Sequence, residues 1–134
     1  MQPFEFVIPS RPVSQQTRRR DRLHIWKEYV RSLAVASWTP INSRPLGTAS
    51  LTLLYLYEEA ALDLDNIVKP IQDALVGVAL DDDALVSDIV IRRRSLRTTF
   101  RLDGLTPVLT AAFDRGGEFV YVKIEDAPAQ EDLL

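Results

Sequence analysis

The segment Ala49–Tyr57 constrains the fold of this chain most strongly, because it is apolar on both of its faces. A strand with one solvated face alternates apolar and polar residues, whereas a strand covered on both faces is apolar throughout. Leu, Thr and Tyr make up most of the segment. Thr and Tyr are among the residues enriched in β-strands. The segment therefore predicts a central strand of a buried sheet.

The rest of the chain shows no internal repeat and no second domain. Thr106 and Pro107 have the pattern of a helix N-cap followed by proline at the first helical position, and we expect Asp21 to be another N-cap. The predicted strands are 4–8, 49–57, 86–94 and 119–124, and the predicted helices are 21–37, 65–75 and 108–113. We expect an α+β fold: a single small domain over 1–126, with a mixed β-sheet of four to five strands and two or three helices. An acidic, disordered tail is expected at 127–134.

Asp63, Asp65 and the run Asp81–Asp83 place five carboxylates close to Lys69 in the sequence. Carboxylates that lie close together raise each other's pKa unless a cation shares their field. Mg²⁺ is a hard ion that proteins hold with one or two carboxylates together with substrate phosphates. This segment therefore predicts metal-assisted chemistry on phosphate esters.

The spacing of these residues suggests how they converge. Asp63 and Asp65 are two residues apart, so an extended chain projects both side chains to the same side. Proline is best tolerated in the first turn of a helix, so Pro70 predicts a late helix start, with both aspartates in the preceding turn. If the next strand neighbours the central strand, Asp83 meets them at one end of the sheet. There the three carboxylates would position Mg²⁺, and Lys69 would stabilise charge on the phosphate.

On spacing alone, structural roles explain the same residues equally well. Asp63 or Asp65 can be a helix N-cap, and Asp81–Asp83 can form a solvated turn. Lys69 can pair with Asp65 or Asp73 on the surface of the helix.

Basic side chains form two clusters, although the formal net charge of the chain is −3. Acidic residues are concentrated from Glu118 onward, and local potential decides whether a polyanion is attracted. Recognition of DNA shape depends on phosphate contacts, which arginine supplies. The candidate DNA-binding residues are Lys69 and the clustered arginines Arg18, Arg19, Arg20, Arg22, Arg92, Arg93 and Arg94.

The chain contains no cysteine, which excludes a disulfide framework and a thiolate metal site. It also lacks a signal-peptide pattern and an apolar run of the roughly 18 residues that a membrane span needs. We therefore expect a cytoplasmic protein with no membrane partner.

The run Asp63-Leu-Asp-Asn-Ile-Val-Lys-Pro-Ile-Gln-Asp-Ala-Leu-Val-Gly77, continued by Asp82–Val86, resembles the RusA family of Holliday junction resolvases. The family pattern is Asp-x-Asp-Asn-x-x-Lys-x-x-x-Asp-Ala-Leu-x-Gly, followed by Asp-Asp. The segment Ile8–Ser14 is similar to the family's proline-containing loop after its first strand.

The resemblance implies a homodimeric, Mg²⁺-dependent endonuclease of phage or prophage type. Such an enzyme binds four-way DNA junctions and makes paired, symmetric nicks in DNA recombination and repair. By position, the resemblance implies that Asp63, Asp65 and Asp83 are catalytic metal ligands, with Asp82 as the other acid of the pair, and that Lys69 is catalytic. Because three aspartates are consecutive, this assignment can shift by one residue.

Leu85 stands where the family has Gln, which removes a polar group near the site. Two alternatives remain open, of which the first is motivated by Leu85. One is a dimeric protein on the same scaffold that binds branched DNA with weakened or lost cleavage. The other is a metal-dependent nuclease for other branched or flapped DNA.

Overall fold

A computed structural model describes residues 2–134 and contains, within them, one four-stranded mixed sheet and three α-helices. The strands are β1 (Phe4–Ile8), β2 (Ala49–Tyr57), β3 (Val86–Ser95) and β4 (Phe119–Asp126). The helices are α1 (Arg20–Ser37), α2 (Asp65–Leu75) and α3 (Pro107–Arg115), with a short 3-10 helix, η1 (Asp83–Leu85), before β3. The predicted α+β fold is confirmed.

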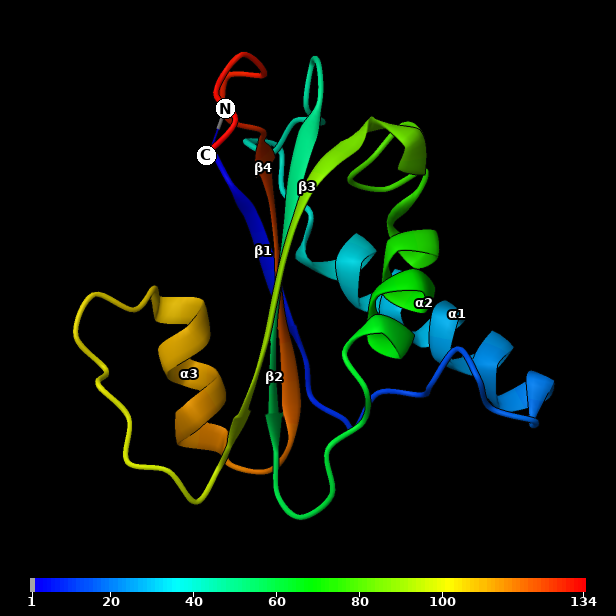
Figure 1. Cartoon of the computed structure of the whole chain (residues 1–134), viewed down its shortest axis with the longest axis vertical. Helices are drawn as coiled ribbons and strands as arrows, with labels where there is room; N and C mark the ends of the chain where they lie inside the picture. The colour runs from blue at the N-terminus through cyan, green and yellow to red at the C-terminus, as the bar shows by residue number, and fades with distance from the viewer. Residues whose placement is uncertain (1) are drawn as a thin grey trace.

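The strand order in the sheet is β1-β4-β2-β3. β2 and β3 are parallel, whereas β4 is antiparallel to both β1 and β2. Helices α1 and α2 cover one face of the sheet, and α3 lies against the other (Figure 1). The connection from β2 through α2 to β3 is therefore a βαβ unit.

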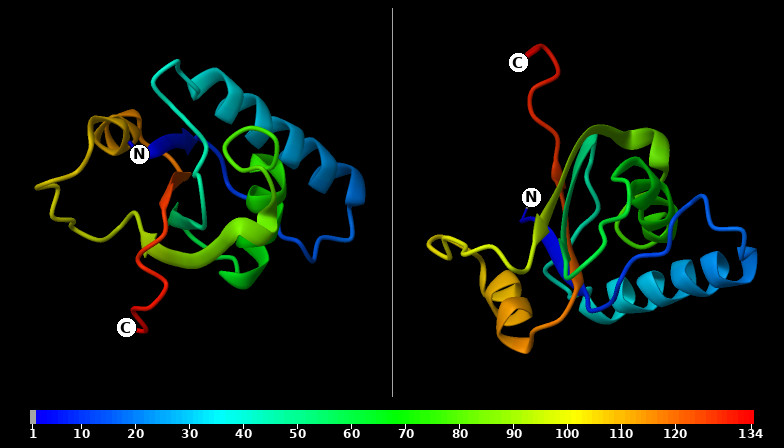
Figure 2. Two further views of the ribbon diagram at one scale, coloured as in Figure 1. Left: turned by 90° about the horizontal axis from the view of Figure 1, so that it is seen from above. Right: turned by 60° about the horizontal axis from the view of Figure 1, so that its bottom comes forward.

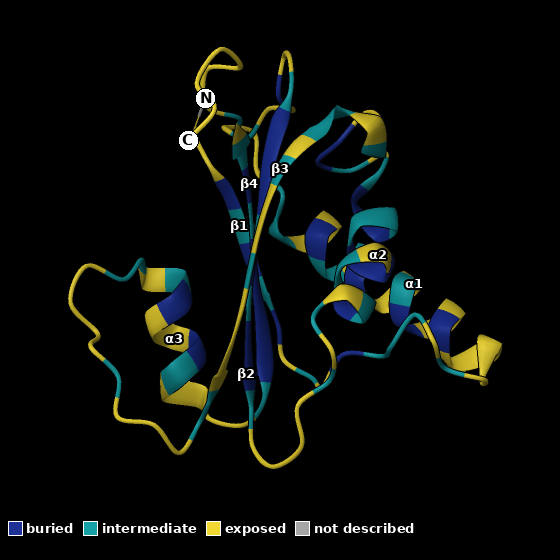
Figure 3. Ribbon diagram, viewed as in Figure 1, coloured by how far each residue is buried: buried dark blue, intermediate teal, exposed yellow. Residues whose placement is uncertain are grey.

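β2 is covered on both faces, as its composition predicted (Figure 3). Leu51, Leu53 and Tyr55 face α1 and α2, while Leu56 faces α3, and all four are fully buried. A fully buried leucine stabilises a fold by roughly 1.5–3 kcal/mol, so this strand anchors both halves of the core.

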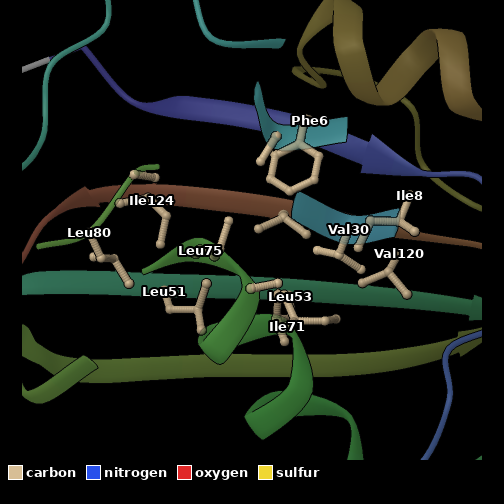
Figure 4. Packing of buried hydrophobic residues seen from close by; sticks show 14 of the residues in the cluster. Phe6, Ile8, Val30, Leu51, Leu53, Ile71, Leu75, Leu80, Val120 and Ile124 are labelled. Atoms are coloured by element: carbon tan, nitrogen blue, oxygen red, sulfur yellow. The ribbon is translucent and has the colours of Figure 1, made fainter. Parts of the chain in front are cut away.

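The larger core fills the space between the sheet and the helices α1 and α2 (Figure 4). Trp26, Val30 and Ala34 recur at four-residue spacing and form the buried stripe of α1. Buried side chains from the other elements include Phe6, Ile8, Leu51, Leu53, Ile71, Leu75, Val120 and Ile124. This packing fixes α2 against the sheet and so fixes the acidic residues that α2 carries.

The predicted caps differ in their outcome. Thr106 caps α3, because its hydroxyl accepts a hydrogen bond from the backbone N–H of Leu109 at 3.4 Å. Asp21 is not an N-cap, since α1 begins one residue earlier, at Arg20. The carboxylate of Asp21 pairs instead with Arg19 at 3.0 Å, and this hydrogen bond lowers the pKa of Asp21.

Pro70 lies inside α2, whose bounds match the predicted range 65–75, but the expectation that Asp65 lies in the turn before the helix is wrong. Proline has no N–H, so Pro70 cannot donate to the carbonyl of Asn66 one turn earlier. The backbone N–H of Gln15 donates to that carbonyl at 2.9 Å. The loop after β1 thus replaces the missing helical hydrogen bond, and Asp65 can be the first residue of α2.

In the described part of the chain, no helix combines the length and apolar character needed to cross a membrane.

Candidate active site

The acidic residues approach one another by a different route from the one their spacing suggested. Asp63 follows the end of β2 and Asp83 precedes the start of β3. Because β2 and β3 are parallel, these two points belong to opposite ends of the sheet, so the prediction that they meet at one sheet end is wrong. Helix α2 runs back alongside the sheet between them (Figure 1). Its side chains therefore provide the link to Asp83.

Lys69, in the middle of α2, is the centre of this link. Its ammonium Nζ lies 2.7 Å from Asp73 Oδ1 and 3.1 Å from Asp83 Oδ2. The hydrogen bonds to Asp73 and then Asp83 raise the pKa of Lys69. The hydrogen bond from Lys69 in turn is the largest cause that lowers the pKa of Asp83. Both directions favour the charged forms of Lys69 and Asp83.

Asp65, Lys69 and Asp73 follow one another at four-residue intervals and therefore share one face of α2. Asp73 Oδ2 also accepts a hydrogen bond from Lys27 of α1 at 3.2 Å. Of the two pairings left open for Lys69 on the helix surface, the one with Asp73 is present. Asp65 lies one helical turn away, and its exposed carboxylate forms no hydrogen bond within residues 2–134.

The three consecutive aspartates have three different partners. Asp81 forms an ion pair with Arg44 at 2.7 Å. Asp82 Oδ1 accepts a hydrogen bond from the backbone N–H of Ala84 at 2.9 Å and caps η1. Only Asp83 contacts Lys69. The structure therefore distinguishes the three by position, because only Asp83 contacts α2, while the catalytic assignment among them stays a prediction.

Hydrogen bonds fix the backbone around Asp83 in addition to its side chain. The amide Nε2 of Gln72, on α2, donates to the carbonyl of Asp83 at 3.2 Å. The guanidinium of Arg44 also donates to the carbonyls of Gly77 and Val78 beyond the end of α2. Gln72 and Arg44 were not predicted as site residues, yet they fix the turn that presents Asp83.

The loop from residue 58 to residue 64, which carries Asp63, is bound at two carbonyls by arginines from other elements. Arg11 Nη1 donates to the carbonyl of Ala60 at 2.6 Å. Arg93 Nη1 donates to the carbonyl of Leu62 at 3.1 Å. Asp63 itself has an exposed carboxylate with no hydrogen bond inside the described chain. Its position therefore depends on the backbone around it.

Glu118 supports the same loop from the start of β4, and it too was not predicted. Its Oε1 accepts the backbone N–H of Glu58 at 2.8 Å and pairs with Arg11 at 3.4 Å. Arg11 also donates to the hydroxyl of Tyr55 at 3.3 Å. Since the side chain of Glu118 is only 14% exposed, this contact joins the loop firmly to the sheet.

The candidate DNA-binding arginines do not form two uniform surfaces. Arg93 is in register with Tyr55 on the face of α2, whereas Arg92 and Arg94 are in register with residues that face α3. In the first cluster, Arg19 is paired with Asp21, and Arg20 donates to the carbonyl of Gln15 at 2.9 Å. The side chains of Arg18 and Arg22 are exposed and have no ion pair within residues 2–134.

The described part of the chain contains no group of three or more His, Cys, Asp or Glu side chains arranged to hold a metal ion. The convergence of Asp63, Asp65 and Asp83 on one ion therefore stays a prediction. In kind, the donors fit a hard divalent cation, because all three are carboxylates on the protein surface. Asp83 already shares its charge with a cation, the ammonium of Lys69.

Surface carboxylates, an ammonium beside one of them and exposed arginines are the kinds of group that reactions of phosphate esters use. Residues 10–102 match the family model described as endodeoxyribonuclease RusA, which covers more than half of the chain. A search of curated proteins finds no match. The chain belongs to the RusA family of Holliday junction endonucleases, as its motifs had indicated.

Proposed function

We propose that this protein is a Mg²⁺-dependent Holliday junction resolvase that acts in the cytoplasm as a homodimer and makes paired, symmetric nicks. The observation that carries the proposal is the position of Lys69, held between Asp73 and Asp83 on the same helical face as Asp65. Family membership supports action on branched DNA.

In this proposal Asp63, Asp65 and Asp83 hold the metal. When bound, Mg²⁺ would supply an activated water and neutralise charge on the phosphodiester. The carboxylate of Asp82 accepts a hydrogen bond from the backbone N–H of Ala84. In this proposal Asp82 therefore orients the turn and is not one of the main metal ligands.

Lys69 binds the scissile phosphate. An ammonium has three N–H donors, and Asp73 and Asp83 accept two of them. The third is left for a phosphate oxygen, and the side chain is 50% exposed, which gives DNA access to it. An ammonium placed there stabilises the negative charge that develops on the phosphate oxygens during hydrolysis.

Homodimerisation would match the symmetry of the substrate. A four-way junction has two-fold symmetry, and a two-fold dimer presents two identical sites to its opposed strands. Exposed arginines such as Arg22 and Arg92 would bind backbone phosphates, which position DNA without reading its sequence.

Nicking of defined substrates tests this proposal. Purified protein is incubated with a four-way junction, a flap and a linear duplex, in Mg²⁺ or in chelator, beside the variants Asp65→Asn and Asp103→Asn. Asp103 is an exposed aspartate between β3 and α3, so it is a matched control. The proposal expects metal-dependent nicking confined to the junction, lost in Asp65→Asn and retained in Asp103→Asn. Nicking that persists in chelator would contradict it.

The second candidate is a protein that binds branched DNA without cutting it. It is favoured by Leu85, an apolar residue two positions from Asp83, and by the absence of a preformed three-carboxylate group in residues 2–134. Tight junction binding without nicking in the same assay would select this function. Preferential nicking of the flap would instead select a nuclease for other branched DNA.

A further inference from the structure

A groove runs between the loop Ser10–Thr17 and the N-terminal half of α1. It consists of two adjoining hollows of about 450 and 400 Å³, which share four lining residues. The shared residues are Ser10, Arg11, Val13 and Arg22. This half of α1 projects beyond the sheet (Figure 2).

The first hollow has the chemistry of a phosphate site. Besides the two arginines, its lining includes the hydroxyl groups of Ser10, Ser14 and Thr17 and the amide of Gln16, and it contains no acidic residue. Arginine, hydroxyl and amide groups are the usual donors to DNA backbone oxygens. Leu62 closes one side of this hollow. The residue after Leu62 in the chain is Asp63, one of the candidate metal ligands.

The positive charge of the groove is only partly neutralised. Arg11 uses a single nitrogen, Nη1, for its contacts with Ala60, Tyr55 and Glu118, so its other N–H groups are left for a ligand. Arg22 has an exposed side chain with no acidic partner in the described chain. An anion that enters the groove meets two guanidinium groups.

Beyond the shared residues, the lining of the second hollow is apolar and aromatic. Trp26 is buried at its base, while Ile25 and Tyr29 line it with side chains that are 64% and 37% exposed. The rings of Trp26 and Tyr29 have centroids 6.1 Å apart. An exposed aromatic ring beside arginines is a typical surface for binding an unpaired base, because a base released from the duplex has a face free to stack on the ring.

We propose that this groove binds an unpaired segment of DNA strand at the branch point. Arg11 and Arg22 bind its phosphates, a base stacks on Tyr29, and the strand continues past Leu62 toward Asp63. The proposal rests on the proposed function for its substrate, and it names the feature of branched DNA that the protein recognises: nucleotides released from pairing at the crossover.

Binding measured by fluorescence anisotropy in chelator tests the groove without cleavage. Three DNAs are compared: a fully paired junction, a junction with two unpaired thymidines at the crossover, and a single-stranded thymidine oligomer. The variants are Arg22→Gln, Tyr29→Ala and the control Arg115→Gln. Arg115 is exposed at the end of α3, on the opposite face of the sheet. Circular dichroism verifies that each variant is folded.

We expect the wild-type protein to prefer the junction with unpaired thymidines. Tyr29→Ala should remove this preference and weaken binding of the oligomer by about fivefold or more, as for the loss of one stacked base. Arg22→Gln should weaken binding of all three DNAs and reduce the slope of log K against log salt by roughly 0.7–0.9, equivalent to one phosphate contact. Arg115→Gln should match the wild type.

Wild-type binding by both groove variants would overturn the proposal. So would a Tyr29→Ala protein that keeps the preference for unpaired thymidines, since the groove would then hold only the backbone of a paired arm. Failure of the proposed function is a different result. In that case the wild-type protein nicks no junction, while the effects of Arg22→Gln and Tyr29→Ala on the oligomer still decide whether the groove binds a strand.

Discussion

The ammonium of Lys69 lies 3.1 Å from Asp83 Oδ2, although the two residues belong to different elements and are 14 positions apart. This contact joins α2 to the turn before β3. It places Lys69, the last residue of the motif Asp63–Lys69, beside Asp83 of the acidic run Asp81–Asp83. The ammonium of Lys69 is therefore shared by two carboxylates, those of Asp73 and Asp83.

Replacement of Lys69 by methionine should abolish most nicking without unfolding the protein. Loss of a donor that stabilises transition-state charge typically reduces the rate by about 10²–10³-fold. The ion pairs of Lys69 are solvent-exposed, so the melting temperature should change little. Single-turnover nicking of a junction measures the effect, with Lys123→Met on β4 as the matched control. A Lys69→Met protein that cuts at the wild-type rate would exclude a catalytic role.

The Asp83 carboxylate should stabilise the protein at neutral pH and lose this effect in acid. The hydrogen bond from Lys69 lowers the pKa of Asp83 below its ordinary value of 3.8. The contribution is therefore present above the ordinary value and disappears as the pH falls through the lower, folded value. Urea unfolding of wild type and Asp83→Asn should show a constant difference in free energy between about pH 5 and 7. That difference should shrink below about pH 4; a gap that widens in acid is the opposite result.

Arg92 and Arg93, neighbours in the sequence, should have separable effects. Arg93→Gln removes the hydrogen bond to the carbonyl of Leu62, so the loop carrying Asp63 loosens and single-turnover nicking slows. Junction affinity in chelator should stay near the wild-type value. Arg92→Gln, on the opposite face of β3, should weaken binding and leave the rate at saturating protein unchanged. Identical profiles for the two variants would contradict this division.

A separate network should contribute to stability alone. Glu5 accepts hydrogen bonds from the hydroxyl of Tyr121 and, at 2.8 Å, from that of Thr106, and so joins β1, β4 and the start of α3. Burial and this contact raise the pKa of Tyr121. Tyr121→Phe should reduce the free energy of unfolding by about 1–2 kcal/mol, because Glu5 loses a partly buried partner. Tyr57→Phe, whose hydroxyl forms no hydrogen bond in residues 2–134, should cost less. Nicking should be normal in both.

The sequence predicted the elements well because their signals are local. An apolar run identified β2 as a central strand, and the Thr106-Pro107 pair located the start of α3. The four-residue spacing also predicted that Lys69 can pair with Asp65 or Asp73, since residues four apart share a helical face.

The remaining features depend on residues that are distant in the sequence. Arg11 and Glu118 are 107 positions apart, and no spacing rule pairs them. Asp81, Asp82 and Asp83 are identical in type, so only the packing of η1 against α2 distinguishes them. The parallel pairing of β2 and β3 places Asp63, after β2, and Asp83, before β3, at opposite ends of the sheet. The sequence spacing could not reveal this. Likewise, Pro70 is tolerated inside α2 because Gln15 supplies a donor from another segment.

Junction nicking by three neighbouring variants, Asp81→Asn, Asp82→Asn and Asp83→Asn, tests the central claim most directly. Each variant removes one charge from the same turn, so only the direction of the side chain differs. The account predicts that Asp83→Asn binds the junction but nicks it at least about 10²-fold more slowly in Mg²⁺. Asp81→Asn, which loses only its exposed pair with Arg44, should cut at nearly the wild-type rate. Wild-type nicking by Asp83→Asn, or a complete loss in Asp81→Asn alone, would contradict the account.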